Sequence, residues 1–366
     1  MSCGANVAAR RGAERAGMGA ESKPKAGTAR PAANAARLAV RILAAAGLLA
    51  LAVWVVGPAR IEEQLRNVAL PWFLAALAAM ALSQWASVWR WESIARIFGL
   101  RVQWRALVVA YAQGMTVNVL LPGATLGGDT LRSVRLQALG NPLGVSALTV
   151  LLDRLSGLWV LCVLSLVTGI ALAAGWFLQG APGPMPIAGA GAGTTAIVVS
   201  KGVFLGYLAG LIFASALPWL PLRLSVASNA PPPSQAGLGA FVLRVWRKIC
   251  SLHDLALAER AALGRSIWMS LIVQFLCAAT LWFCLRAAGG SAQYWQVQAV
   301  AAPVFVAGAL PISYGGFGAR EITALIAFPL VGLPAEAGLA ASALYGIVAI
   351  VLGLAAAPSF TLRGKP

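Results

Sequence analysis

The chain has 366 residues, of which 60% are hydrophobic and only 11% are charged. Soluble domains have ~45–50% apolar and ~25% charged residues, so this composition excludes an ordinary soluble enzyme and most secreted proteins. The formal net charge of +17 would suggest nucleic-acid binding only if the basic residues formed one contiguous face. They are scattered between long apolar runs instead. We therefore expect a polytopic membrane protein with no nucleic-acid partner.

The chain starts with a segment, 1–37, that is rich in Ala, Gly, Arg and Pro and reads as a disordered basic tail. The apolar stretch that follows, 38–57, is long enough to span a bilayer and therefore is not a signal peptide. Two other apolar regions, 106–121 and 297–333, are interrupted by Pro and Gly. Further stretches of spanning length are 69–89, 155–178, 196–219, 266–286 and 337–358.

Basic residues indicate which loops face the cytoplasm, because Lys and Arg collect on that side of a membrane. Loops 179–195 and 287–296 carry no charge at all. This pattern predicts cytoplasmic N- and C-termini. It also predicts that the loop arginines mainly set orientation and tolerate exchange for Lys. The basic segments are 1–41 with eight Lys/Arg, 90–105 with four, 220–265 with six and 359–366 with two.

The predicted fold is all-α, with six full transmembrane helices and two re-entrant hairpins formed by the interrupted regions. If each hairpin arm is a span, the count rises to eight or more helices. The first hairpin would open to the cytoplasm and the second to the outside, which relates them by inverted topology. The membrane domain is expected over 38–358, followed by a short cytoplasmic tail, 359–366. Trp85, Trp89 and Trp91 lie at a predicted cytoplasmic boundary and are expected to form an aromatic belt.

The two interrupted regions carry similar motifs. Residues 121–132 read LPGATLGGDTLR, and residues 310–321 read LPISYGGFGARE. Irregular backbone is tolerated in a membrane only where it is buried in protein or lines a wet cavity. Paired Gly/Pro breaks are a sequence sign of a transporter site near the bilayer midplane, and backbone N–H groups at a helix start can bind a phosphate. We therefore expect a polar cavity between the two breaks.

Charged side chains near the breaks are the main candidates for binding, because intramembrane charges are retained mostly where they function. Arginines suit bidentate contact with phosphate oxygens, and the carboxylates would orient them or meet a cationic headgroup. The alternative interpretation is that acid and arginine form local ion pairs that hold broken helices together. Asn118 is as well suited to capping or helix packing as to substrate contact. Arg135, which follows the first break, is a further basic residue beside a predicted membrane segment. The candidate substrate-binding residues are Asn118, Pro122, Gly127, Gly128, Asp129, Arg132, Asp153, Arg154, Gly315, Gly316, Arg320 and Glu321.

At residues 118–135, 152–157 and 310–321 the sequence resembles the lysylphosphatidylglycerol synthase transmembrane-region family, the flippase-like membrane domain also found in the MprF proteins. The resemblance covers roughly residues 38–358. It implies an inner-membrane protein that moves or binds a lipid, such as an anionic phospholipid or a polyprenyl-phosphate-type lipid. MprF proteins continue into a soluble aminoacyl-transferase domain. This chain stops at Pro366, so we expect it not to make an aminoacyl-lipid by itself.

The first functional hypothesis is therefore a lipid flippase or transporter that binds an anionic headgroup. A membrane-embedded enzyme that uses Asp129, Asp153 and Glu321 for acid–base chemistry is an alternative, as is a scaffold for a separate lipid-modifying enzyme. The only histidine is His253 and the five cysteines form no ligand pattern, so we expect no metal, no cofactor and no catalytic residues. No ATP-binding loop is recognisable in the sequence. The free energy for any lipid transport would therefore come from an ion gradient, the membrane potential or the concentration gradient of the lipid itself.

Overall fold

The computed structural model describes residues 68–120, 125–178, 201–216, 259–310 and 318–361. Within these ranges the chain is helical and has no β-strand. Four helices are long and apolar enough to cross a membrane, which confirms an all-α polytopic membrane protein. They are α4 (Leu70–Ile97), α7 (Leu143–Leu178), α11 (Arg260–Ala287) and α14 (Ala335–Ala355).

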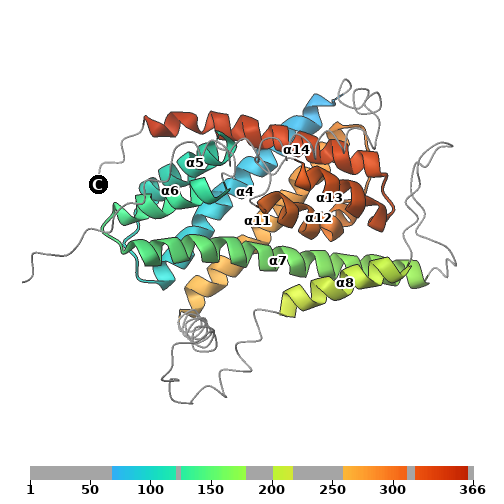
Figure 1. Cartoon of the computed structure of the whole chain (residues 1–366), viewed down its shortest axis with the longest axis horizontal. Helices are drawn as coiled ribbons and strands as arrows, with labels where there is room; N and C mark the ends of the chain where they lie inside the picture. Colours follow the sequence, from blue (N-terminus) through green and yellow to red (C-terminus); the bar gives the residue numbers. More distant parts are fainter. Residues whose placement is uncertain (1–67, 121–124, 179–200, 217–258, 311–317, 362–366) are drawn as a thin grey trace, which may run out of the picture. The chain divides into compact units, whose positions relative to one another are not determined.

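The predicted interrupted region 106–121 is a single helix that packs against the next helix along the chain, whereas the region 297–333 contains two helices that pack against each other. The predicted span 196–219 contains a helix of 16 residues, α8, and the predicted span 38–57 lies outside the described residues. Figure 1 shows the pairs α5/α6 and α12/α13 on either side of α4 and α11. The remaining elements are α5 (Trp104–Leu120), α6 (Thr125–Gln137), α8 (Lys201–Ala216), α12 (Tyr294–Ala309), α13 (Ala319–Ala327), α14's 3-10 extension η4 (Ala357–Phe360) and the 3-10 turn η3 (Phe328–Val331).

Two helices extend well beyond their predicted spans. Helix α4 continues eight residues past 89 to Ile97, so the first part of the predicted loop 90–105 is helical. Helix α7 begins at Leu143 rather than at 155 and has 36 residues, which gives it a length of roughly 54 Å at 1.5 Å per residue. Asp153 and Arg154 therefore lie inside a long helix, not at its head.

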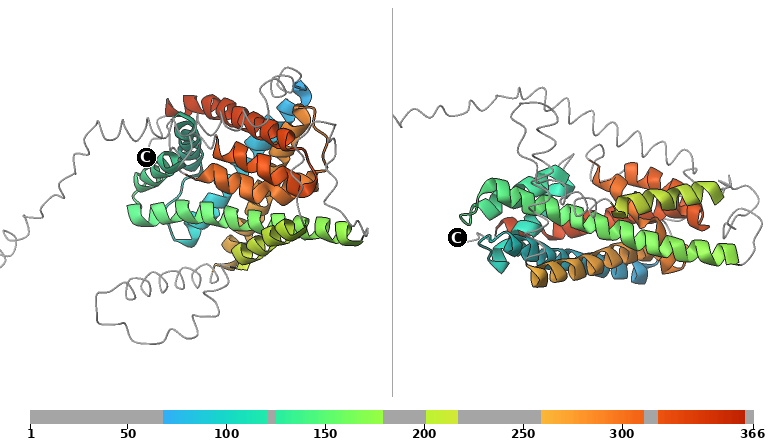
Figure 2. Two further views of the ribbon diagram at one scale, coloured as in Figure 1. Left: turned by 45° about the vertical axis from the view of Figure 1, so that its right-hand side comes forward. Right: turned by 90° about the horizontal axis from the view of Figure 1, so that it is seen from below.

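Helices α4 and α11 form the most extensive helix pair and give the bundle its frame. Each ends at a glycine with positive φ, 64° at Gly99 and 80° at Gly289, a conformation that only glycine adopts without strain. Helix α7 lies alongside α8 and α12, as the views in Figure 2 also show. The fold thus sets α4, α6 and α7 beside one another at the first break.

Helix α12 contains Pro303, which cannot donate the usual hydrogen bond to the carbonyl of Ala299 four residues earlier. The hydroxyl of Tyr207 on α8 donates to that carbonyl instead. Ser165 on α7 donates to the carbonyl of Gln298 at 2.8 Å. Side chains of two neighbouring helices therefore satisfy the interrupted backbone, as a membrane interior requires.

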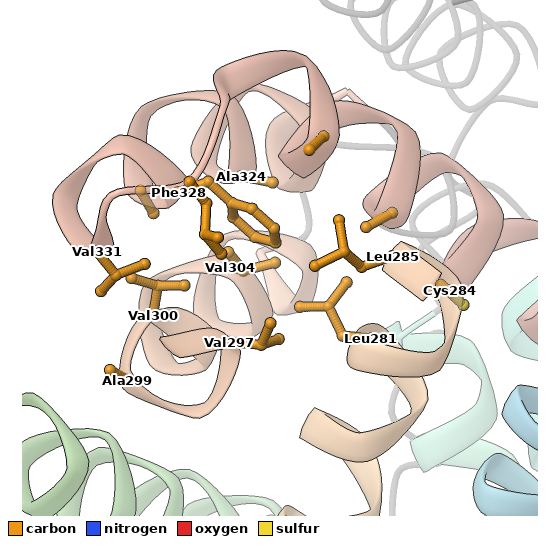
Figure 3. Close-up of a cluster of buried hydrophobic side chains, with 14 of the residues drawn as sticks. Leu281, Cys284, Leu285, Val297, Ala299, Val300, Val304, Ala324, Phe328 and Val331 are labelled. Carbon is orange, nitrogen blue, oxygen red and sulfur yellow. The ribbon is translucent and has the colours of Figure 1, made fainter. Parts of the chain in front are cut away.

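The largest hydrophobic core joins α11, α12, α13, η3 and α14. Phe328 is fully buried at its centre and lies against Val304 and Ala324 in Figure 3. Leu281 and Leu285 of α11 face the same cluster. This core fixes the second hairpin firmly against the long helices.

Candidate functional site

The carboxylate of Asp153 on α7 lies at the centre of a buried group of charges. Its Oδ1 accepts a hydrogen bond from Nε of Arg90 on α4 at 2.7 Å, and its Oδ2 accepts one from Nη2 of Arg132 on α6 at 2.9 Å. All three residues are at most 5% exposed. Asp153 therefore joins three helices, and two guanidinium groups share its single negative charge.

The guanidinium of Arg132 is held between two aromatic rings. Its Cζ lies 4.2 Å from the ring centroid of Trp91 on α4 and 4.4 Å from that of Tyr111 on α5. Such cation–π contacts contribute ~2 kcal/mol when they are desolvated. The indole N–H of Trp91 also donates to the hydroxyl of Thr149 on α7 at 3.3 Å. Aromatic rings of α4 and α5 thus fix Arg132 in addition to its ion pair with Asp153 on α7.

Asp129 and Arg154 form the accessible part of the group. Arg154 donates to Asp129 from Nη2 at 2.9 Å and from Nε at 3.1 Å, and 45% of its side chain is exposed. Asp129 Oδ1 is also 3.5 Å from Nη1 of Arg132. Asp153 and Arg154, although adjacent in sequence, therefore bind different partners, contrary to the interpretation that they form a local pair.

We call Arg90, Asp129, Arg132, Asp153 and Arg154 the charge cluster. Three arginines face two carboxylates, which leaves one positive charge unmatched within it. Nη1 of Arg90 and Nε of Arg132 are buried and have no hydrogen-bond partner among the residues that the structure describes. An uncompensated cation away from water is strongly unfavourable. The charge cluster therefore suits an anion that approaches from the exposed side of Arg154.

Glycines allow the close approach of the helices that carry the charge cluster. A Cβ at Gly157 on α7 would lie 2.6 Å from Nη1 of Arg90 and 2.9 Å from Nε2 of Gln274. A Cβ at Gly128 on α6 would lie 2.4 Å from the carbonyl oxygen of Gly114 on α5. At Gly128 the close neighbour is backbone, so no side chain fits there, whereas at Gly157 the ends of Arg90 and Gln274 would have to shift. These two glycines are needed for packing and do not require a role in binding.

Asn118 has a structural contact that links the two arms of the first hairpin. Its Oδ1 accepts a hydrogen bond from the backbone N–H of Gly128 at 3.1 Å. That N–H belongs to the first turn of α6, where backbone donors have no partner within the helix. Gly127 lies beside it in the same turn and is partly buried. The observed contact agrees with the packing interpretation of Asn118.

Arg320 and Glu321, the charged residues of the second motif, form a buried ion pair at the start of α13. Arg320 donates from Nη2 to Oε1 of Glu321 at 3.0 Å and from Nε to the hydroxyl of Ser342 on α14 at 3.0 Å. Ser342 donates to the same Oε1 at 3.0 Å, and Glu321 accepts the backbone N–H of Gly318. Arg320 and Glu321 are 4% and 0% exposed. Arg320 and Glu321 therefore form a local ion pair, as the alternative interpretation of the sequence predicted.

Two further contacts link helices near the two motifs. The thiol of Cys277 on α11 is 3.2 Å from the hydroxyl of Ser83 on α4. The ring centroid of Tyr345 on α14 is 5.1 Å from Cζ of Arg320 at the start of α13.

The sequence predicted that Arg90 lies in a cytoplasmic loop whose arginines tolerate exchange for Lys. This prediction was wrong, because Arg90 lies inside α4 and is buried. Ser83, Ser87 and Arg90 recur at helical spacing and are all buried, a polar stripe that marks an internal helix face. Trp91 was expected in the aromatic belt with Trp85 and Trp89, but its side chain is fully buried.

Trp85 and Trp89 are 52% and 38% exposed and pack against Trp104, in line with a belt. Pro122, Gly315 and Gly316 lie outside the described residues. Of the arginines predicted to bind phosphate, Arg132 and Arg320 are buried and bonded, whereas Arg154 is accessible.

Comparison with known proteins supports a lipid-related membrane role. Residues 38–357 match the family described as lysylphosphatidylglycerol synthase TM region. A search of curated proteins finds no match. Since the family match covers most of the chain and includes every described helix, the chain belongs to the lysylphosphatidylglycerol synthase TM region family.

Proposed function

We propose that this protein binds an anionic phospholipid or a related lipid-linked phosphate through the charge cluster and moves its headgroup across the membrane. The observation that carries the proposal is the unmatched positive charge among Arg90, Arg132 and Arg154. Two buried guanidinium N–H groups there have no acceptor. A phosphate would supply both the missing charge and the missing acceptors, and arginine is well suited to bind it.

The position of the charge cluster suggests that the headgroup enters from the cytoplasmic leaflet. Arg90 lies seven residues, or about 10 Å, before the end of α4 at Ile97. Arg96, Arg101 and Arg105 follow closely in the sequence, and basic segments of this kind face the cytoplasm. Arg154 would then be the first cation that an incoming headgroup meets.

Binding and movement are favoured over acid–base catalysis by the state of the carboxylates. Asp153 accepts from two arginines, and Glu321 accepts from Arg320, Ser342 and a backbone N–H. A general acid or base needs a proton site within reach of a substrate. These carboxylates are buried and occupied by donors, so their arrangement favours a positioning role.

The proposal is tested with the purified full-length chain in vesicles that contain fluorescent phosphatidylglycerol or phosphatidylcholine in one leaflet. Transbilayer movement is followed by dithionite quenching, and lipid binding is measured in parallel by native mass spectrometry. We expect faster movement and tighter binding of the anionic lipid. Arg154→Gln should weaken that binding about 10- to 100-fold, because a charge-assisted hydrogen bond contributes ~1.5–3 kcal/mol.

Arg96→Gln is the matched control, since Arg96 is also an exposed arginine paired with a carboxylate, Glu92, at 2.7 Å. It should leave movement and binding unchanged. Equal movement of both lipids, or equal loss in Arg154→Gln and Arg96→Gln, would contradict the proposal. A lipid-linked phosphate such as undecaprenyl phosphate, added as a competitor, distinguishes the two sources of the same phosphate chemistry.

A further inference from the structure

An apolar groove of about 240 Å³ lies between α4, α5 and α14. The three helices also contact one another directly. Each contributes residues three or four positions apart: Gln84 and Val88 from α4, Val108 and Ala112 from α5, and Leu352 and Ala355 from α14. The groove is therefore formed by one face of each helix and belongs to the packed part of the protein.

The groove adjoins the charge cluster at Tyr111. This residue lines the groove, and its ring also lies 4.4 Å from Cζ of Arg132. Val88 lines the groove on α4 and precedes Trp91 by three residues, about one helical turn. Trp91 covers Arg132 at 4.2 Å. An apolar chain in the groove would thus end next to the guanidinium groups.

The size of the groove limits what it can hold. Pockets for drug-sized ligands usually measure ~300–1,000 Å³, so a groove of about 240 Å³ accommodates a segment of one acyl chain and not a whole lipid. Charge complementarity identifies the rest of the occupant, because the adjoining cluster carries an unmatched positive charge. We infer that the groove binds one acyl chain of an anionic phospholipid whose headgroup lies at the charge cluster. This inference rests on the proposed function.

Occupancy of such a groove must depend on the headgroup. In a bilayer an acyl chain is already in apolar surroundings, so entry into the groove yields no hydrophobic free energy. Any preference for one lipid therefore comes from the contact of its headgroup with the arginines. A surface that merely faces the bilayer would not distinguish headgroups in this way.

The experiment uses two photoreactive phospholipids with the same diazirine-bearing acyl chain, one phosphatidylglycerol and one phosphatidylcholine. The full chain is reconstituted with each lipid, irradiated and analysed by peptide mass spectrometry. We expect at least threefold more labelling of groove residues by the anionic lipid. Peptides of α8, where Phe213 is 72% exposed, should be labelled equally by both lipids and serve as an internal control.

Two substitutions fill the groove from opposite walls, Ala112→Trp on α5 and Ala355→Trp on α14. Both should abolish the preference of groove labelling for the anionic lipid. Ala209→Trp, at an exposed position of α8, is the matched control and should leave the preference intact. Ala355 is itself exposed, so a larger side chain is tolerated there without disturbing the fold.

The outcomes separate the groove from the proposed function. If wild-type protein shows no preference for phosphatidylglycerol in native mass spectrometry, the proposed function fails. If that preference is present but both lipids label the groove equally, the acyl-chain inference alone is overturned. Preferential labelling that persists in both Trp variants would also overturn it, because the filled groove could not hold a chain.

Discussion

Asp153→Asn should strongly destabilise the protein while changing the shape of the side chain very little. The wild-type carboxylate accepts from Arg90 at 2.7 Å and from Arg132 at 2.9 Å. Neutralising it leaves three arginines with one carboxylate and raises the net charge of the cluster by one. Removing one partner of a buried ion pair costs ~3–5 kcal/mol. At about 2 °C per kcal/mol for a chain of this size, Tm should fall by roughly 6–10 °C.

The assay is thermal unfolding of the purified full chain in detergent, followed by tryptophan fluorescence and by size-exclusion chromatography of heated samples. Arg105→Gln is the control, because Arg105 is exposed on α5. Substitutions at exposed positions change stability by ~0.5 kcal/mol or less, so Tm should change by at most about 1 °C. A fall for Asp153→Asn no larger than that of the control would refute the reasoning.

A second variant tests whether charge balance is the cause. Arg90→Gln combined with Asp153→Asn removes one charge of each sign and restores the original net charge of the cluster. We expect the double variant to be more stable than Asp153→Asn alone, as coupled residues do not behave additively. A double variant less stable than the single one would indicate that packing, and not charge, sets the cost.

Three further predictions use the same unfolding assay. Gly128→Ala should lower the free energy of unfolding by ~1–3 kcal/mol through overpacking, since its Cβ would lie 2.4 Å from a backbone carbonyl oxygen. Gly175→Ala is the control and should be neutral or slightly stabilising, because its Cβ would meet nothing within 4 Å. Trp91→Leu should cost ~3 kcal/mol through lost packing and cation–π contact, and Trp89→Leu, at a 38% exposed position, less than ~1 kcal/mol. Ser342→Ala should cost ~1.5–3 kcal/mol, because the hydroxyl bonds both charged groups of the second motif.

The sequence alone predicted the membrane class and the four long spans, because hydropathy reports directly on these features. It could not predict where α4 ends. Arg90 lowers the mean hydropathy of the segment around it, so the end of the helix is predicted as a loop. Ser83, Ser87 and Arg90 nevertheless form an internal polar stripe. A helical-periodicity search of charged positions would have found it.

The pairing of the charges could not be predicted, because it depends on tertiary contacts. Asp153 and Arg154 are neighbours in sequence, but successive residues of a helix point about 100° apart. Asp153 consequently faces α4 and α6, while Arg154 reaches Asp129. The same limit applies to Trp91, whose role follows from contact with Arg132 on another helix.

The two motifs look alike in sequence, but their charges are arranged differently, and this has a consequence for transport. In the first, Asp129 precedes Arg132 by three residues, so both lie on one face of α6 and Arg132 can also reach Asp153 on α7. In the second, Glu321 caps its own helix and takes up the adjacent Arg320. The charge cluster around the first motif therefore has one arginine in excess, whereas Arg320 and Glu321 of the second motif balance each other. If the protein acts as proposed, we expect the anionic headgroup to bind first at the charge cluster.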